Sequence, residues 1–182
     1  MKDEGEKYKN IHQELIDKCR IGDSKAHFEI YRLYYKAMYN TCLRILGDPH
    51  EAEDVMQESF FKAFDKISSY RNEVSFGAWL RKIVVNSSLD TLKKRKINFS
   101  PIDMASGLKE DEDDEIDTES IEMIKAAMSQ LPEGYRTVLT LYLVEEYDHE
   151  EIGQMLGITS STSRSQYARA RQKLIEILKQ KK

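Results

Sequence analysis

Hydrophobic positions recur every three or four residues between 51 and 67, which predicts an amphipathic helix with one buried face. The small and apolar residues of this buried face are Ala52, Val55, Met56, Ser59, Phe60, Ala63, Phe64 and Ile67. At about 100° per residue, a second set falls on the opposite face: Asp54, Gln57, Glu58, Phe61 and Asp65. An aromatic ring among acids on a solvent-facing surface is typical of a docking site for another protein.

A second helix is predicted over residues 76–96, and it combines aromatic with basic side chains. The aromatic and basic residues of its first turns are Phe76, Trp79, Arg81 and Lys82. Rings that stack on bases, interleaved with cations that pair with phosphates, favour the binding of single-stranded nucleic acid. The polar residues 68–75 are predicted to form the loop between the two helices.

Two further helices are predicted before this hairpin. A short one has its apolar residues on one side, namely Ile11, Leu15, Ile16 and Cys19. A long one covers about residues 25–46, and its inner stripe consists of Ile30, Tyr31, Tyr34, Met38, Cys42 and Ile45. Its tyrosines are interpreted as core residues without a chemical role: Tyr31, Tyr34, Tyr35 and Tyr39. Either Asp23 or Ser24 can cap the long helix, and Gly47 with Pro49 predicts where it ends.

Residues 98–118 differ in character from the helical segments around them. The run from Glu110 to Glu115 consists entirely of acidic residues, and such a run repels itself and stays extended. We interpret residues 98–118 as an acidic linker between two helical domains at 10–97 and 119–182. The fold class is therefore all-α, with two small domains.

The second domain contains the pattern of a helix-turn-helix between residues 149 and 174. Asp148 can cap the first helix, Gly157 suits the sharp turn, and the hydroxyls of residues 159–162 can cap the second helix. The side chains predicted to face inward from the second helix are Tyr167, Ala170, Leu174 and Ile177. Those predicted on its exposed side are Arg164, Ser165, Ala168 and Arg169. This arrangement is typical of a recognition helix in a major groove, where arginine pairs with guanine.

Composition agrees with a helical protein, since charged residues make up 33% of the chain and only eight Gly and three Pro occur in 182 residues. Cys19 and Cys42 are too few for a disulfide framework, and the sequence has no signal peptide or membrane-length apolar run, so we expect a cytoplasmic protein. The four histidines are scattered, without metal-ligand spacing, and we expect no metal or cofactor.

The first domain resembles domain two of bacterial sigma factors, in particular the extracytoplasmic-function (ECF) group of the sigma-70 family. The matching residues are Asp48, Glu51, Ala52, Glu53, Asp54, Gln57, Glu58, Phe61, Tyr70, Arg71, Phe76, Trp79, Leu80 and Asn86. The second domain resembles domain four of the same group through Leu131, Pro132, Arg136, Leu139, Glu151, Ile152, Leu156, Gly157, Thr162, Arg169, Ala170 and Arg171. It departs from that pattern at Thr159, Ser161, Ser163 and Ala168, where proline, glycine, valine and a larger side chain are usual. Ser163, at the usual valine position, should face inward.

This resemblance implies an alternative sigma factor that binds core RNA polymerase, through the beta and beta-prime subunits, and directs initiation at promoter DNA. The polymerase-binding residues would be Asp48, Glu51, Asp54, Gln57, Glu58 and Phe61. The melted −10 element would contact Tyr70, Arg71, Asn72, Val74, Ser75, Phe76, Trp79, Arg81, Lys82 and Asn86. The duplex −35 element would contact Ser161, Thr162, Arg164, Ser165, Ala168, Arg169 and Arg171.

Within the −10 set, the resemblance implies a pocket for a base flipped out of the strand, lined by residues 71–75 with Tyr70 and Phe76 as walls. It also implies an anti-sigma partner, often membrane-bound in this group. The acidic linker is either a solvated tether or a segment that mimics nucleic acid in the polymerase channel. The polymerase would perform the chemistry, so we expect no enzymatic activity from this chain.

Two alternatives remain open at the level of sequence. One is an autonomous helix-turn-helix regulator, which would bind promoter DNA without polymerase and would need a dimerisation surface. The other is a nucleic-acid enzyme that uses the acids between Glu110 and Asp117 to bind a divalent metal. Promoter binding without polymerase would indicate the first, and metal-dependent cleavage would indicate the second.

Overall fold

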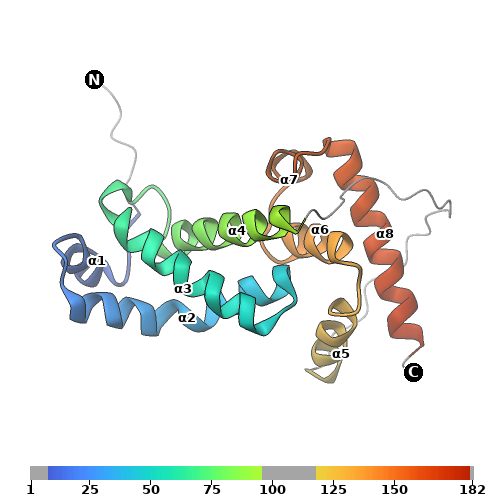
Figure 1. Ribbon diagram of the computed structural model, residues 1–182, viewed down its shortest axis with the longest axis horizontal. Helices are drawn as coiled ribbons and strands as arrows, with labels where there is room; N and C mark the ends of the chain where they lie inside the picture. The colour runs from blue at the N-terminus through green and yellow to red at the C-terminus, as the bar shows by residue number, and fades with distance from the viewer. Residues whose placement is uncertain (1–7, 96–117, 181–182) are drawn as a thin grey trace. The chain divides into compact units, whose positions relative to one another are not determined.

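The computed structural model describes residues 8–95 and 118–180, and the regular elements in these ranges are α-helices with one short 3-10 helix (Figure 1). Contacts divide the chain into two compact units, Met1–Leu92 and Lys93–Lys182. The prediction of an all-α protein with two helical domains is confirmed. The acidic run from Glu110 to Glu115 lies outside the described residues.

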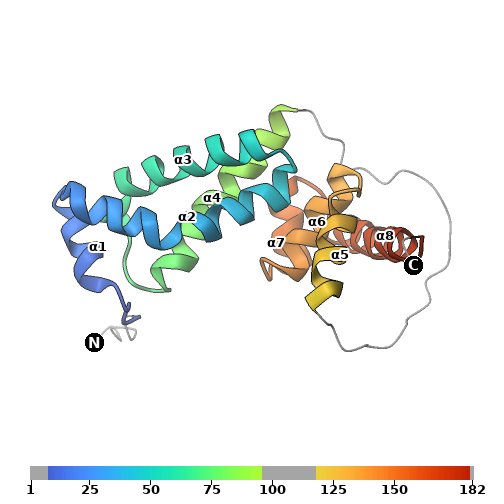
Figure 2. The same ribbon diagram turned by 90° about the horizontal axis from the view of Figure 1, so that it is seen from below.

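The first unit is built on an antiparallel pair of helices, α2 (Ser24–Leu46) and α3 (Pro49–Asp65), which lie side by side (Figure 2). The turn between them follows from its sequence. Gly47 adopts a left-handed conformation with φ 74°, and the Asp48 side chain accepts a hydrogen bond from the Glu51 N–H at 2.9 Å. The short helix α1 (Gln13–Arg20) packs on α2, and the 3-10 helix η1 (Ile67–Ser69) leads into the loop before α4 (Phe76–Lys94).

The core of the first unit lies where α1, α2, α3 and α4 meet, and its largest fully buried side chains are Ile16, Ile30, Met38, Ile45, Leu46, Phe76, Leu80, Val84 and Leu92. The predicted buried face of α3 is confirmed, although Phe64 is only half-buried. Two smaller expectations are wrong. Ile11 is 94% exposed because α1 begins two residues after it, and Tyr35 is 44% exposed on α2.

The second unit consists of α5 (Thr118–Met128), α6 (Glu133–Leu143), α7 (His149–Leu156) and α8 (Ser160–Lys179). The long helix α8 packs against the other three. Leu131, Leu139 and Ala170 are buried together, with further packing from Met128, Tyr135, Tyr167, Leu174 and Ile177. The four side chains predicted to face inward from α8 therefore do so.

The helix-turn-helix is formed by α7 and α8, and the sequence explains each of its boundaries. Asp148 and Glu151 form a capping box at the start of α7. Gly157 ends α7 with φ 69°, a conformation that glycine adopts without a steric penalty. The Thr159 hydroxyl then accepts a hydrogen bond from the Thr162 N–H at 3.0 Å and so caps α8.

Candidate functional sites

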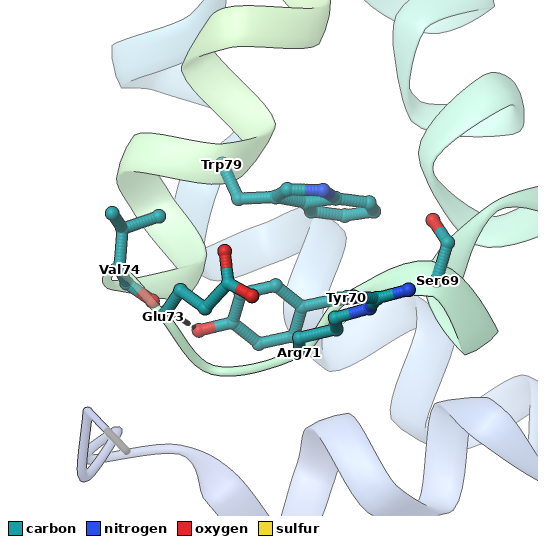
Figure 3. A pocket seen from close by; sticks show the side chains of 6 residues that line it. All are labelled: Ser69, Tyr70, Arg71, Glu73, Val74 and Trp79. Atoms are coloured by element: carbon teal, nitrogen blue, oxygen red, sulfur yellow. Dashed lines mark hydrogen bonds between the residues drawn. The ribbon is translucent and has the colours of Figure 1, made fainter. Parts of the chain in front are cut away.

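The loop between η1 and α4 surrounds a cavity of about 280 Å³, shown in Figure 3. Its lining consists of Ser69, Tyr70, Arg71, Glu73, Val74 and Trp79. The Tyr70 and Trp79 rings lie 5.2 Å apart and provide an aromatic wall. Arg71 and Glu73 are exposed and place a cation and an anion at the same opening, so a flat ring could stack on the wall and use its edge for hydrogen bonds.

Three residues predicted for this pocket have other positions in the structure. Phe76 does not line the cavity, so the expectation that it forms a wall is wrong; it is buried behind Tyr70 and Trp79, with its ring 5.5 Å and 5.4 Å from theirs. The Asn72 amide donates to Gln13 at 2.8 Å, on α1. The Ser75 hydroxyl accepts from the Ala78 N–H at 3.1 Å and caps α4, as serine commonly does at this position.

The loop is also held by residues that the sequence pattern did not indicate. The Arg20 guanidinium donates to the Tyr70 carbonyl at 2.8 Å and lies over the Tyr70 ring. The Asn10 amide nitrogen donates to the Tyr70 hydroxyl at 2.8 Å. Burial of the Tyr70 ring raises the pKa of its phenol, which therefore stays protonated at neutral pH. Each contact joins positions at least 50 residues apart, and no local motif predicts such pairs.

Along α4, the predicted nucleic-acid residues do not all share one face. Trp79, Lys82 and Asn86 are separated by three and four positions and lie along one side of the helix. Arg81 is two positions from Trp79, about 200° around the axis, and faces elsewhere. Asn86 is exposed on this side.

The predicted docking face on α3 is exposed at Asp54, Gln57, Glu58 and Phe61, and the Phe61 side chain is 74% exposed. Beside it lies an apolar groove of about 570 Å³, lined by His27, Phe28, Tyr31, Gln57, Phe60, Phe61 and Phe64. The α2 residues of this groove were not predicted, because Tyr31 fits the pattern of a core residue and Phe28 belongs to no stripe. Asp48 caps α3, and Glu51 is half-buried in its first turn.

The predicted recognition side of α8 is largely exposed. Ser161, Arg164, Ser165 and Arg171 are exposed, whereas Thr162, Ala168 and Arg169 are half-buried. The Ser165 hydroxyl donates to the Ser161 carbonyl at 3.0 Å, one turn earlier on α8. The helix thus carries hydroxyl, methyl and guanidinium groups on a regular scaffold, which is the chemistry that reads base edges and phosphates.

The polar residue Ser163 faces inward, as its place in the pattern predicts, and it is fully buried. Its hydroxyl lies 2.9 Å from His149 Nδ1, and the His149 ring stacks on Tyr142 with centroids 4.4 Å apart. Burial lowers the pKa of His149, and the nearby Arg164 charge lowers it further. The structure therefore pairs a hydroxyl at the usual valine position with an imidazole from α7.

Neither a metal cluster nor a membrane-spanning helix is found in the part of the chain that the structure describes. Within residues 8–95 and 118–180, no group of three or more His, Cys, Asp or Glu side chains could hold a metal ion. The described helices are all too short or too polar to cross a bilayer.

Each of the two units matches a known family model. The Sigma-70 region 2 model matches residues 30–97, and the Sigma-70 region 4 model matches residues 121–174. Among curated proteins, SigW of Bacillus subtilis, an ECF RNA polymerase sigma factor, is 31% identical over 177 residues, covering 90% of this chain and 95% of SigW. SigM of the same organism is 32% identical over 150 residues, covering 80% and 91% of the two chains.

Two solved structures share the fold. CnrH, in complex with the cytosolic domain of CnrY, has a TM-score of 0.53 at 17% identity over 93% of this chain and 98% of CnrH. The sigma factor RpoE of Bartonella quintana, in complex with the anti-sigma factor NepR, has a TM-score of 0.53 at 22% identity over 83% and 95%.

A helical unit of the region 2 type followed by a helix-turn-helix unit of the region 4 type defines the sigma-70 class of initiation factors. The chain belongs to the ECF RNA polymerase sigma factors. It is an alternative sigma factor that directs transcription initiation.

Proposed function

We propose that the two units divide promoter recognition between an opened strand and a duplex. In this proposal residues 10–97 hold core RNA polymerase and the melted −10 element, and residues 119–182 read the −35 element. Residues 98–118 link the two activities. Strand opening requires no bond chemistry from this chain, because tighter binding to separated strands is enough to shift the equilibrium. The polymerase performs the chemistry, in the cytoplasm.

The loop cavity in the first unit carries this proposal. A base flipped out of the −10 strand loses stacking worth a few kcal/mol, and a shaped pocket must return that free energy. The partly exposed Trp79 offers a ring for stacking, backed by the buried Tyr70, while Arg71 and Glu73 offer a donor and an acceptor for the base edge. Lys82 and Asn86 lie further along the Trp79 side of α4 and would follow the strand.

For the polymerase we propose the α3 face of Asp48, Glu51, Asp54, Gln57, Glu58 and Phe61, together with the neighbouring groove. A side chain that is 74% exposed and borders an apolar groove is suited to become a central contact when a partner covers it. Beta and beta-prime subunits of core polymerase would occupy this face. An anti-sigma protein, often membrane-bound in this group, would cover the same face and keep the factor inactive, while this chain itself makes no membrane contact.

For the −35 element we propose the exposed side of α8, namely Ser161, Thr162, Arg164, Ser165, Ala168, Arg169 and Arg171. Arg164 is exposed near the N-terminal end of α8, the part of a recognition helix that reaches base edges. Arg171 lies farther from that end and would add phosphate contacts that are independent of sequence.

In vitro transcription with bacterial core RNA polymerase, with and without this protein, tests the proposal on a library of promoter fragments. We expect new transcripts that start downstream of a shared two-part promoter. Phe61→Ala should weaken core binding about tenfold, whereas Leu33→Ala, which removes another exposed apolar side chain from the same unit, should not. If neither transcripts nor a complex with core polymerase forms, the proposed polymerase and promoter contacts are wrong.

A further inference from the structure

A buried asparagine ahead of α1 contacts both ends of the loop that surrounds the cavity. Asn10 is 8% exposed and belongs to a segment outside the region 2 match, which begins at residue 30. Its amide oxygen accepts from the Phe76 N–H at 2.8 Å, at the first residue of α4. Its amide nitrogen donates to the Tyr70 hydroxyl at 2.8 Å, and that hydroxyl donates to the Val74 carbonyl at 2.6 Å (Figure 3).

The donor and the acceptor of each of these three hydrogen bonds are fixed by chemistry. A backbone N–H can only donate, so the atom of Asn10 facing Phe76 must be the oxygen. The amide nitrogen must then face Tyr70, whose hydroxyl accepts that bond and has one proton left to give. The Val74 carbonyl can only accept, and it receives this proton. The three hydrogen bonds, from Phe76 to Asn10, from Asn10 to Tyr70 and from Tyr70 to Val74, thus form a relay whose donors and acceptors cannot be exchanged.

The relay lies directly behind the cavity. Tyr70 and Val74 both line it, on opposite ends of the turn, and the Tyr70 hydroxyl joins them. A second tie holds the middle of the loop, where Asn72 has φ 60° and contacts Gln13 and Arg20 on α1. Residues far from the loop in sequence thus determine the shape of a surface that they do not themselves line.

We propose that Asn10 is a positioning residue for base selection: its one-way relay through Tyr70 to Val74 holds the cavity in the shape that discriminates one flipped base from the others. This inference rests on the proposed role of the cavity in binding the −10 strand. It assigns specificity to a residue that contacts no nucleic acid. A preformed pocket loses less conformational entropy when the base enters than a loop that must order itself at that moment.

The relay predicts how three variants behave. In Asn10→Asp the new carboxylate still accepts from the Phe76 N–H but has no proton to donate, so the Tyr70 hydroxyl turns toward it and releases Val74. Tyr70→Phe keeps the aromatic wall and removes the same bond to Val74. Both substitutions remove the same hydrogen bond, so the loss of selectivity in the double variant should not exceed that of the larger single variant. Asn40→Asp, at an exposed position on α2, controls for the added charge.

The test uses the full chain bound to core polymerase and promoter fragments with a constant −35 duplex. The −10 region is opened in advance by mismatches, and one non-template base is changed at a time. The measured quantity is the affinity ratio between the preferred base and the other three at the most selective position. We expect this ratio to fall about three- to tenfold in Asn10→Asp, Tyr70→Phe and the double variant, and to stay unchanged in Asn40→Asp.

Three results would overturn the inference. An unchanged ratio in both single variants would show that the relay does not set selectivity. Losses of selectivity that add in the double variant would show general damage to the fold. So would losses of selectivity that accompany equal losses of affinity for core polymerase and for the −35 element. If the wild-type protein shows no base preference in the opened strand, the proposed role of the cavity itself is refuted. This outcome is visible without any variant.

Discussion

The loop cavity of the first unit and the exposed side of α8 in the second differ in how they are built. The cavity combines a loop, one turn of α4 and, behind them, side chains from the N-terminal segment. The recognition side is one face of a single regular helix. An unpaired base has two faces and an edge to be held, so it needs a concave site, whereas the major groove of a duplex accepts a helix as it stands. Opened and duplex DNA thus place different demands on the fold.

Substitutions that disturb the packing beneath the recognition helix should impair −35 binding more than substitutions on its exposed side. A Cβ on Gly153 would lie 2.8 Å from the Ile158 carbonyl oxygen, and both groups belong to backbone that cannot easily move. Gly153→Ala should therefore destabilise the second unit by about 3 kcal/mol and abolish −35 binding. Thermal unfolding and binding to −35 duplex would measure this, with core binding retained through the first unit.

Gly157→Ala is the matched control for that experiment. A Cβ at Gly157 meets nothing within 4 Å, and its cost comes only from the left-handed backbone at φ 69°, about 1 kcal/mol. Equal destabilisation by the two alanines would show that close packing of α7 against the turn is not what holds the recognition helix.

The same contrast explains what the sequence predicts well. The buried face of α3 and the inward side of α8 repeat at helical spacing, so a one-dimensional pattern is enough to place them. The caps at Asp148 and Thr159 are equally local, because each accepts a hydrogen bond from an N–H within three residues. Hence most of the helices and the orientation of the recognition side follow from the sequence.

The cavity is less predictable because its shape depends on contacts between distant positions. The family resemblance assigns a pocket to this loop, but it does not give the correct walls: Phe76 and Trp79 are both aromatic, and only tertiary packing buries Phe76 and leaves Trp79 to line the cavity. The support from Asn10 has no periodic or motif signal at all. Similarly, Ser163 is predicted to face inward, but its partner His149, on the preceding helix, is not.

For the cavity, replacing Trp79 is the sharpest test. Trp79→Ala removes one ring of the aromatic wall and should weaken binding of opened −10 strand by about 2 kcal/mol, the usual contribution of a base stacked on an aromatic side chain. Fluorescence anisotropy of the polymerase-bound factor on pre-opened fragments would measure it. Trp79→Phe retains a ring and should recover most of the affinity, while −35 binding should be the same in both variants.

For the recognition side, Arg164→Ala should cost about 1–2 kcal/mol and should relax the preference at one base pair of the −35 element. Lys179→Ala, at the far end of α8, removes the same charge and should reduce affinity for all sequences alike. Competition binding with single-base variants of the −35 duplex separates these outcomes. A uniform loss in Arg164→Ala would assign that residue to phosphate instead of a base.

The smallest expected effect concerns the pH dependence of the second unit, through His149. Burial lowers the pKa of this imidazole, Arg164 lowers it further, and only Asp148 acts in the opposite direction. The folded state therefore binds fewer protons than the unfolded state near the ordinary histidine pKa of about 6.5, so stability must decrease as pH falls through that window.

This titration also tests how firmly the recognition helix is held, because His149 on α7 contacts Ser163 on α8. Nuclear magnetic resonance titration of the His149 ring should give a midpoint below the ordinary histidine value of about 6.5. His149→Gln should flatten the acid side of the stability profile, since the proton-binding group is gone. A midpoint for His149 at the ordinary histidine value would mean that the imidazole opens to solvent and that α8 is held less rigidly than its contacts with α7 imply.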